Sequence, residues 1–182
     1  RDYRVSHSGI ASDNVVALGS AYSDLLLPGA GMRVDRELLQ RHYTIDIVRQ
    51  KTVLIALTWH HGGALAHWGD EPELIGRLVA HLGDANILYR LHDRHRYERP
   101  YLRALEALVA RYPNVQLKFK SESPDSLVDL AVSDVMVSNY SSILNAYYYT
   151  RKPSVHILPD GDHYRKMGPF GVRTLRVEDG GG

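Results

Sequence analysis

From residue 52 onward, short apolar runs alternate with longer amphipathic segments, and this alternation limits the fold more than any other feature of the sequence. Residues 52–58 are apolar almost throughout, which is typical of a strand covered on both faces. Residues 72–82 begin with proline and repeat apolar residues every three or four positions, as an amphipathic helix does. Strands and helices that alternate in this way form right-handed βαβ units around a parallel sheet.

The later segments continue the pattern, so the predicted fold class is α/β, a doubly wound Rossmann-like parallel sheet. Residues 33–50 are charged and lack a clear period, and we expect a helix or connector there. Two short apolar runs, at residues 15–18 and 25–27, precede that stretch. We expect further strands at residues 86–91, 115–119, 134–138, 153–158 and 172–177, and further helices at residues 99–112, 124–132 and 142–150.

Composition excludes several kinds of chemistry. The sequence has 182 residues, of which 44% are hydrophobic and 24% charged, the balance of a globular domain. Its formal net charge of +1 gives no electrostatic reason to expect nucleic-acid binding. It has no Cys, which excludes disulfides, zinc–thiolate sites and thiol nucleophiles. No apolar run approaches the roughly 18 residues of a membrane span.

Residues 133–149 are the strongest candidate for a ligand site. A parallel sheet binds ligands at the carboxyl ends of its strands, and here a predicted strand ends at Ser138. Tyr140, Ser141 and Ser142 then lead into a predicted helix, whose first turn exposes unpaired N–H groups with positive dipole character. The two hydroxyls add donors, so the pattern predicts a phosphate site. A serine that only caps the helix is the alternative.

The run S-D-V-M-V-S-N-Y-S-S-I, followed by R-K-P-S-V-H-I, resembles the donor-binding domain of CDP-glycerol glycerophosphotransferases, the teichoic-acid polymerases and primases of the GT-B class. The runs T-V-L-I-A-L-T-W, I-L-Y-R-L-H, P-D-G-D-H-Y and G-P-F resemble further motifs in the family's order, so the resemblance covers residues 52–170. It implies the C-terminal half of a GT-B fold. Residues 1–50 would be the tail of the acceptor-side domain and a connector, and residues 51–182 the nucleotide-donor-binding domain.

Three positions depart from the family pattern. Asn139 and Asn145 stand where the family usually has Asp, and Leu57 replaces a Pro. The loss of two carboxylates leaves a sister glycosyltransferase or a divergent capsule enzyme as alternatives to unaltered glycerophosphotransferase chemistry.

The resemblance implies that Arg90 and His92 face the diphosphate of the donor. Guanidinium and imidazolium groups neutralise a departing nucleoside phosphate, and a histidine can donate a proton near neutral pH, so His92 is the catalytic candidate. A solvated basic loop is the alternative for residues 90–96. His92 and His95 form an H-x-x-H pattern with no convincing third ligand, so no metal site is expected. The other candidates for donor and phosphate binding are Trp59, His60, Asn139, Tyr140, Ser141, Ser142, Asp160 and Asp162.

For two pairs of these candidates, an ordinary structural role is the alternative to ligand binding. Trp59 and His60 precede paired glycines that let a backbone approach a ligand, but the same run also suits a surface loop. Asp160 and Asp162 flank a glycine in what is also a good turn sequence. The sequence has no G-x-G-x-x-G, Walker or G-x-S-x-G motif, which argues against nicotinamide cofactors, P-loop phosphoryl transfer and serine hydrolysis.

We therefore expect a transferase that moves a glycerophosphate or related polyol-phosphate unit from a CDP-linked donor, such as CDP-glycerol, to a cell-surface polymer, with this chain supplying the donor-binding half. A GT-B glycosyltransferase or sugar-nucleotide epimerase using a UDP-sugar is the alternative enzyme. A degenerate nucleotide-binding or scaffolding module is the non-enzyme alternative.

Expected partners are the nucleotide-linked donor and a polymer or lipid-linked acceptor, with no nucleic acid and no obligatory cofactor or metal. The resemblance puts the catalytic base in the acceptor domain, so we expect this fragment to be inactive alone. We expect it in the cytoplasm at the inner face of the cell membrane, with peripheral membrane contact through segments outside this sequence.

Overall fold

A computed structural model of the chain describes residues 9–16, 18–29, 33–58, 65, 70–123, 125–139 and 141–157. Its centre is one five-stranded parallel sheet in the order β3-β2-β1-β4-β5. The first strand, β1, lies in the middle of the sheet. From there the chain runs outward through β2 to β3, and it then crosses back to form β4 and β5 on the other side of β1. The doubly wound parallel sheet predicted from the sequence is therefore confirmed. The strands are β1 (Thr52–Ala56), β2 (Asn86–Leu91), β3 (Val115–Phe119), β4 (Val135–Ser138) and β5 (Ser154–His156).

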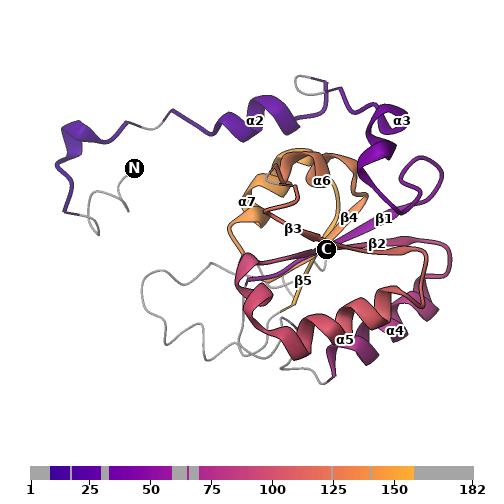
Figure 1. Cartoon of the computed structure of the whole chain (residues 1–182). Helices are drawn as coiled ribbons and strands as arrows, with labels where there is room; N and C mark the ends of the chain where they lie inside the picture. Colours follow the sequence, from indigo (N-terminus) through magenta and orange to yellow (C-terminus); the bar gives the residue numbers. More distant parts are fainter. Residues whose placement is uncertain are drawn as a thin grey trace, which may run out of the picture.

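Helices cover both faces of this sheet (Figure 1). One face carries α4 (Glu71–Leu82) and α5 (Arg99–Val109), which follow β1 and β2. The other carries α6 (Leu127–Val132) and α7 (Ile143–Tyr147), with α2 (Ala21–Leu26) and α3 (Arg36–Leu39) beyond them. The short 3-10 turns are η1 (Ser12–Asn14), η2 (Gln40–His42), η4 (Asp93–Tyr97) and η5 (Tyr148–Thr150).

Alternate side chains of the central strands enter two separate cores. Leu54 and Leu88 pack in the core beneath α6 and α7, whereas Ile55, Ile87 and Tyr89 pack in the core beneath α4 and α5. All five are at most 2% exposed. Because both faces of β1 and β2 are covered, neither strand has a solvent face, and their sequences are apolar at nearly every position.

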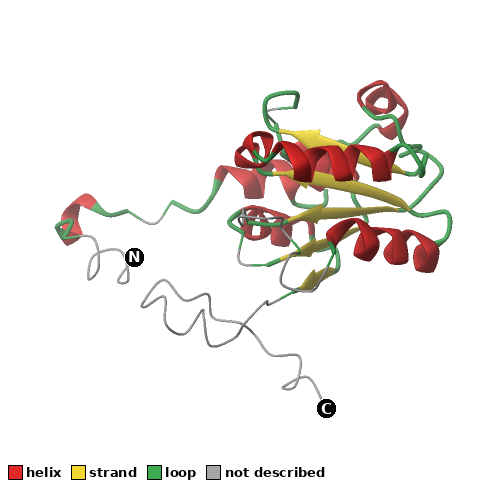
Figure 2. Ribbon diagram, turned by 60° about the horizontal axis from the view of Figure 1, so that its bottom comes forward, coloured by secondary structure: helices red, strands yellow, loops and turns green. Residues whose placement is uncertain are grey.

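The stretch before β1 is part of this packing. Tyr43, Ile45 and Ile47 are buried in the same core as Leu54. The apolar run at residues 25–27 lies at the end of α2, whereas the described residues ahead of α2 extend away from the sheet (Figure 2). The domain boundary expected at residue 50 stays a prediction, although the segment just before it packs tightly on the sheet. The strand expected at residues 172–177 lies outside the described residues.

A charged cluster, the amino-edge cluster of Asp134, Arg36, Lys51 and Lys152, fixes the amino ends of β1 and β4. Asp134 accepts hydrogen bonds from the backbone N–H of Thr52 at 2.9 Å, from Lys51 Nζ at 3.1 Å and from Arg36 Nη2 at 3.2 Å. Burial raises the pKa of the Asp134 carboxyl, but these bonds and charges outweigh burial, so the pKa lies below its ordinary value.

Arg36 and Lys152 also cap the carboxyl end of α6. Arg36 donates to Val132 O at 2.7 Å, and Lys152 Nζ donates to Ala131 O at 2.5 Å and to Ser133 O at 2.7 Å. The last carbonyls of a helix have no partner within the helix, so these cations satisfy them. Lys152, the lysine of the R-K-P motif, therefore stabilises the carboxyl end of α6.

Candidate functional site

A pocket of about 380 Å³ opens at the carboxyl ends of the strands, where the order of the sheet reverses between β1 and β4. Loops on either side of such a reversal separate and leave a crevice, which is the usual ligand site of this fold. Four of the residues singled out from the sequence lie together in its wall, namely Arg90, His92, Ser141 and Ser142. The remaining lining residues are Tyr22, Ala56, Leu57, Leu91, Asp93, Lys120, Ser126 and Ile143.

Ser141 and Ser142 precede the first turn of α7. The Ser142 side chain makes no capping hydrogen bond, and α7 begins at Ile143. Within the described part of the chain, neither serine hydroxyl has a hydrogen-bond partner, while both residues border the pocket. The structure therefore gives no support to the alternative in which a serine only caps the helix, and it leaves two hydroxyl donors for a ligand.

The ends of β1 and β4 are joined directly below the pocket. Asn139, which is 6% exposed, accepts the backbone N–H of Thr58 at 3.0 Å, and Ser138 Oγ donates to Ala56 O at 2.6 Å. Asn139 needs only its carbonyl oxygen for this bond, so an asparagine can hold the strand ends as an aspartate would, without burying a charge. Its role in donor binding stays a prediction. Asn145 is exposed on α7, and its departure from the family pattern has no evident structural consequence.

Arg90, the penultimate residue of β2, is buried to 8% exposure beneath the pocket. Its Nη1 forms an ion pair with Asp129 of α6, and its Nη2 donates to Ser123 O at 2.6 Å. The guanidinium is thus anchored by two protein groups, and Arg90 still borders the pocket, with further N–H groups left for a ligand.

Asp129 is the centre of a buried charged group, the pocket-floor cluster of Asp129, Arg90, Lys118 and Tyr43. Lys118 Nζ donates to Asp129 Oδ1 at 2.9 Å, and the Tyr43 hydroxyl donates to the same oxygen at 2.6 Å. Lys118 Nζ also lies 4.0 Å from the centre of the Tyr43 ring. Burial and the charge of Asp129 raise the pKa of Tyr43, so its hydroxyl keeps its proton and remains a donor.

Sequence reasoning missed Asp129. Its only signal was an acidic residue among the apolar positions of a predicted amphipathic helix, where a buried carboxylate must be paired. The pairing partners come from β2, β3 and the stretch before β1, and their convergence is a property of the fold.

His92 is exposed at the pocket mouth and caps the turn η4. Its Nδ1 accepts the backbone N–H of Arg94 at 3.2 Å. That bond places the proton of the neutral ring on Nε2, because only an unprotonated Nδ1 can accept. His92 is therefore held as a hydrogen-bond donor through Nε2, and protonation of Nδ1 would break the cap.

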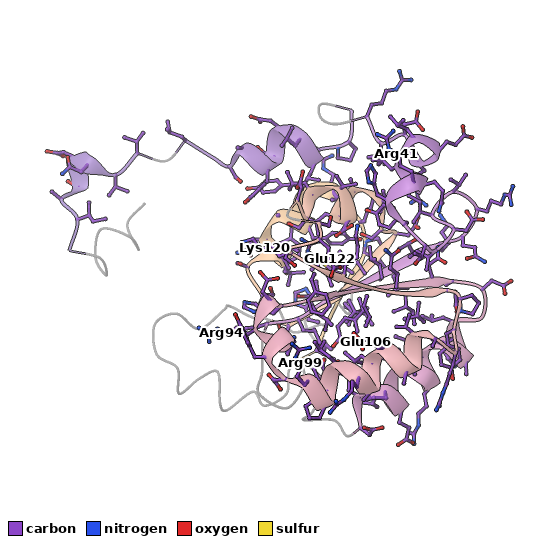
Figure 3. All side chains as sticks on the ribbon, viewed as in Figure 1. Arg41, Arg94, Arg99, Glu106, Lys120 and Glu122 are labelled. Atoms are coloured by element: carbon purple, nitrogen blue, oxygen red, sulfur yellow. The ribbon has the colours of Figure 1, made fainter. Side chains whose placement is uncertain are left out.

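Two charged pocket residues, Asp93 and Lys120, were not among the sequence candidates. Asp93 Oδ1 is buried and has no hydrogen-bond partner in the described structure. Lys120 is exposed just after β3 and lies at the same end of the molecule as Arg94, whereas Arg41 lies toward the opposite end (Figure 3). The signal for both was their place one or two residues after a predicted strand.

Five of the predicted donor-binding residues lie outside the described residues, namely Trp59, His60, Tyr140, Asp160 and Asp162. Among the residues that the structure does describe, no three His, Asp or Glu side chains group as a metal site would require. In the same part of the chain, no helix has the length and apolar character needed to cross a membrane.

Comparisons with known proteins agree with this fold. The chain is 27% identical over 164 residues to the teichoic acid poly(ribitol-phosphate) polymerase of Bacillus spizizenii, a match that covers 89% of this chain and 25% of that protein. The solved wall teichoic acid polymerase TagF matches with a TM-score of 0.67 and 22% identity, over 92% of this chain and 38% of that one. A TagF variant soaked with CDPG matches equally well, with a TM-score of 0.67 over 93% of this chain and 39% of the variant.

This chain therefore spans about a quarter of the curated relative's length and less than two fifths of the solved polymerase structures. The sequence pattern of one family, CDP-glycerol:poly(glycerophosphate) glycerophosphotransferase, matches residues 9–172, which is nearly the whole chain. The chain belongs to the CDP-glycerol:poly(glycerophosphate) glycerophosphotransferase family.

Proposed function

We propose that this chain is the donor-binding part of a transferase that moves a glycerophosphate or related polyol-phosphate unit from a CDP-linked donor to a polymer. The observation that carries the proposal is a single pocket, at the strand-order reversal, that gathers Arg90, His92, Ser141 and Ser142. All four residues can donate hydrogen bonds, and a nucleoside diphosphate offers acceptors in abundance.

In this proposal the diphosphate lies over the pocket floor. Arg90 donates from below, Ser141 and Ser142 donate from the loop before α7, and His92 donates through Nε2–H from the mouth. The acceptor hydroxyl gives its proton to the base expected in the acceptor-side domain and attacks the phosphorus of the glycerophosphate group, and the bond from that phosphorus to the oxygen of CMP breaks. Negative charge builds on the departing CMP, and donors fixed in place before the reaction stabilise that charge.

The Nδ1 contact of His92 supports a particular part for this residue in the step. With Nδ1 accepting the Arg94 N–H, the neutral ring carries its proton on Nε2 and can donate a hydrogen bond to the leaving phosphate. The proposed acceptor is a cell-surface polymer or its lipid-linked precursor, presented at the inner face of the cell membrane.

Calorimetric titration with CDP-glycerol, CDP, UDP and UDP-sugars tests the proposal. Selective binding of the cytidine nucleotides is the expected result. Preference for uridine nucleotides would instead favour the UDP-sugar enzyme, and a failure of every nucleotide to bind, both to this chain and to the intact protein, would leave the scaffolding module.

A paired variant tests the residue roles. Ser142→Ala combined with Arg90→Ala should weaken CDP by about tenfold or more, the loss expected from charge-assisted hydrogen bonds, and leave cytidine nearly unchanged. Arg41→Ala is the matched control, because Arg41 is an exposed arginine outside the pocket. Equal losses for CDP and cytidine in the paired variant would contradict the assigned roles, provided that circular dichroism shows a folded protein.

A further inference from the structure

Arg90 is held in place by the protein before any ligand arrives. The Asp129 carboxylate binds its Nη1 and the Ser123 carbonyl binds its Nη2, so both arms of the guanidinium are fixed by residues that do not line the pocket. Asp129 itself does not line the pocket, and its side chain is 0% exposed. It can therefore affect a ligand without contact, either by fixing Arg90 or through its charge.

Asp129 is in turn held by residues that do not border the pocket. Lys118 and Tyr43 both donate to its Oδ1, which leaves Oδ2 for Arg90. The two oxygens thus have separate tasks, one fixing the carboxylate and the other fixing the guanidinium. Rigid donors lose less freedom when a ligand binds, which strengthens binding.

We propose that Asp129 is a positioning residue that holds the Arg90 guanidinium on the pocket floor in the orientation a diphosphate requires. This inference rests on the proposed donor site. The competing explanation is that the cluster acts only through charge, since Arg90, Lys118 and Asp129 together carry a formal charge of +1 next to the pocket.

Two variants separate position from charge. Lys118→Met removes one positive charge and keeps the Arg90–Asp129 pair, and methionine fills a similar volume beside the Tyr43 ring. Asp129→Leu with Lys118→Met restores the formal charge of wild type but removes the anchor. A leucine side chain offers no acceptor, so Arg90 loses its carboxylate partner.

Calorimetric titration with CDP and with cytidine provides the readout. For Lys118→Met we expect a CDP affinity within about threefold of wild type, because a single charge outside the pocket contributes little through the intervening dielectric. For the double variant we expect a CDP loss of about tenfold or more, with cytidine unchanged. The opposite order, a large loss in Lys118→Met and wild-type affinity in the double variant, would overturn the proposal in favour of charge alone.

Wild-type protein that binds no CDP would reject the proposed donor site, whereas normal CDP binding by wild type and by the double variant would reject only the role of Asp129. If the double variant does not fold, nuclear magnetic resonance of the wild type decides. An anchored Arg90 guanidinium gives separate Nη–H signals without CDP. A single averaged signal, as from a freely rotating group, would overturn the inference.

Discussion

Asp134 and Asp129 each accept hydrogen bonds from one arginine, one lysine and one uncharged donor, yet they serve different ends of the sheet. Asp134 is partly exposed, with 21% of its side chain accessible, and its partner Lys51 is 81% exposed. The Asp129 side chain is 0% exposed, and those of Arg90 and Lys118 are each 8% exposed. The same set of contacts is therefore partly exposed to water at one edge and enclosed in the protein interior at the other.

The difference in burial decides what each carboxylate can do. Ion pairs at the surface contribute little because water and salt weaken them, whereas a buried charge that loses its partner is strongly unfavourable. The amino-edge cluster binds backbone groups: Asp134 accepts the N–H at the start of β1, and Arg36 donates to a carbonyl at the end of α6. One cation of the pocket-floor cluster, Arg90, borders the pocket. Of the two clusters, only this one therefore contributes both to the stability of the fold and to the proposed ligand binding.

The largest effect should come from Asp129→Asn. This change leaves Arg90 and Lys118 buried without a counter-charge, and we expect a loss of about 3–5 kcal/mol in the free energy of unfolding. Urea denaturation measures the loss. Adding Lys118→Met should recover part of the loss, since one of the two uncompensated cations is then gone. No recovery in the double variant would show that the carboxylate acts by some means other than pairing.

Arg36→Ala should come next, with a loss of about 1–3 kcal/mol, because it leaves the carbonyls of Ile47 and Val132 without their side-chain donor and removes one of the three donors to Asp134. We expect CDP affinity to stay at the wild-type value in the same variant. Denaturation and calorimetry on one preparation give both numbers. A fall in CDP affinity that matches the fall in stability would show that the amino-edge cluster also affects ligand binding, which would contradict the difference drawn between the two clusters.

Acid should weaken the amino-edge cluster in a defined direction. The pKa of Asp134 is lower in the folded protein than in the unfolded chain, so the unfolded chain takes up the proton first as the pH falls. The stabilisation that Asp134 provides is complete at pH values above its pKa in the unfolded chain. It is lost as the pH falls through the pKa of Asp134 in the folded protein, from about pH 5 downward. In denaturation curves at several pH values, the difference between wild type and Asp134→Asn should therefore shrink toward low pH. Asp13→Asn, on the exposed turn η1, is the control and should show no such convergence.

The smallest effect should come from Lys51→Ala. Its ammonium group is bonded to Asp134 but is largely in water, so we expect a loss of less than about 1 kcal/mol that disappears in high salt. Thermal unfolding at low and high ionic strength provides the measurement. A larger loss that salt does not reduce would mean that exposure is the wrong basis for ranking the two clusters.

The sheet could be predicted from the sequence because burial on two faces forces apolar residues at successive positions. The expected ranges for β2 and β3 match the structure at both ends. The helix expected at residues 124–132 begins later, at Leu127, where Asp125 accepts the backbone N–H of that residue in the turn ahead of it. The apolar run at residues 25–27 was ambiguous because a run of three residues shows no period.

The candidate site was predictable only where its residues follow strands. Arg90, His92, Ser141 and Ser142 all lie at or just after the carboxyl end of a predicted strand, and the topology of a parallel sheet brings such residues together. Asp129 and Tyr43 could not be found in this way. Their pairing is long-range, between a helix and the segment before β1, and no local pattern encodes it.

Tyr22 has a consequence for the time course of binding. It is the only pocket residue among those described that comes from α2, a helix of six residues, and its side chain is half exposed. A short, thinly covered helix opens locally at a low free-energy cost, whereas the strands and the buried ion pairs of the floor do not. In the proposed function the floor therefore sets the affinity for the donor, and opening of α2 raises the rates of entry and release together.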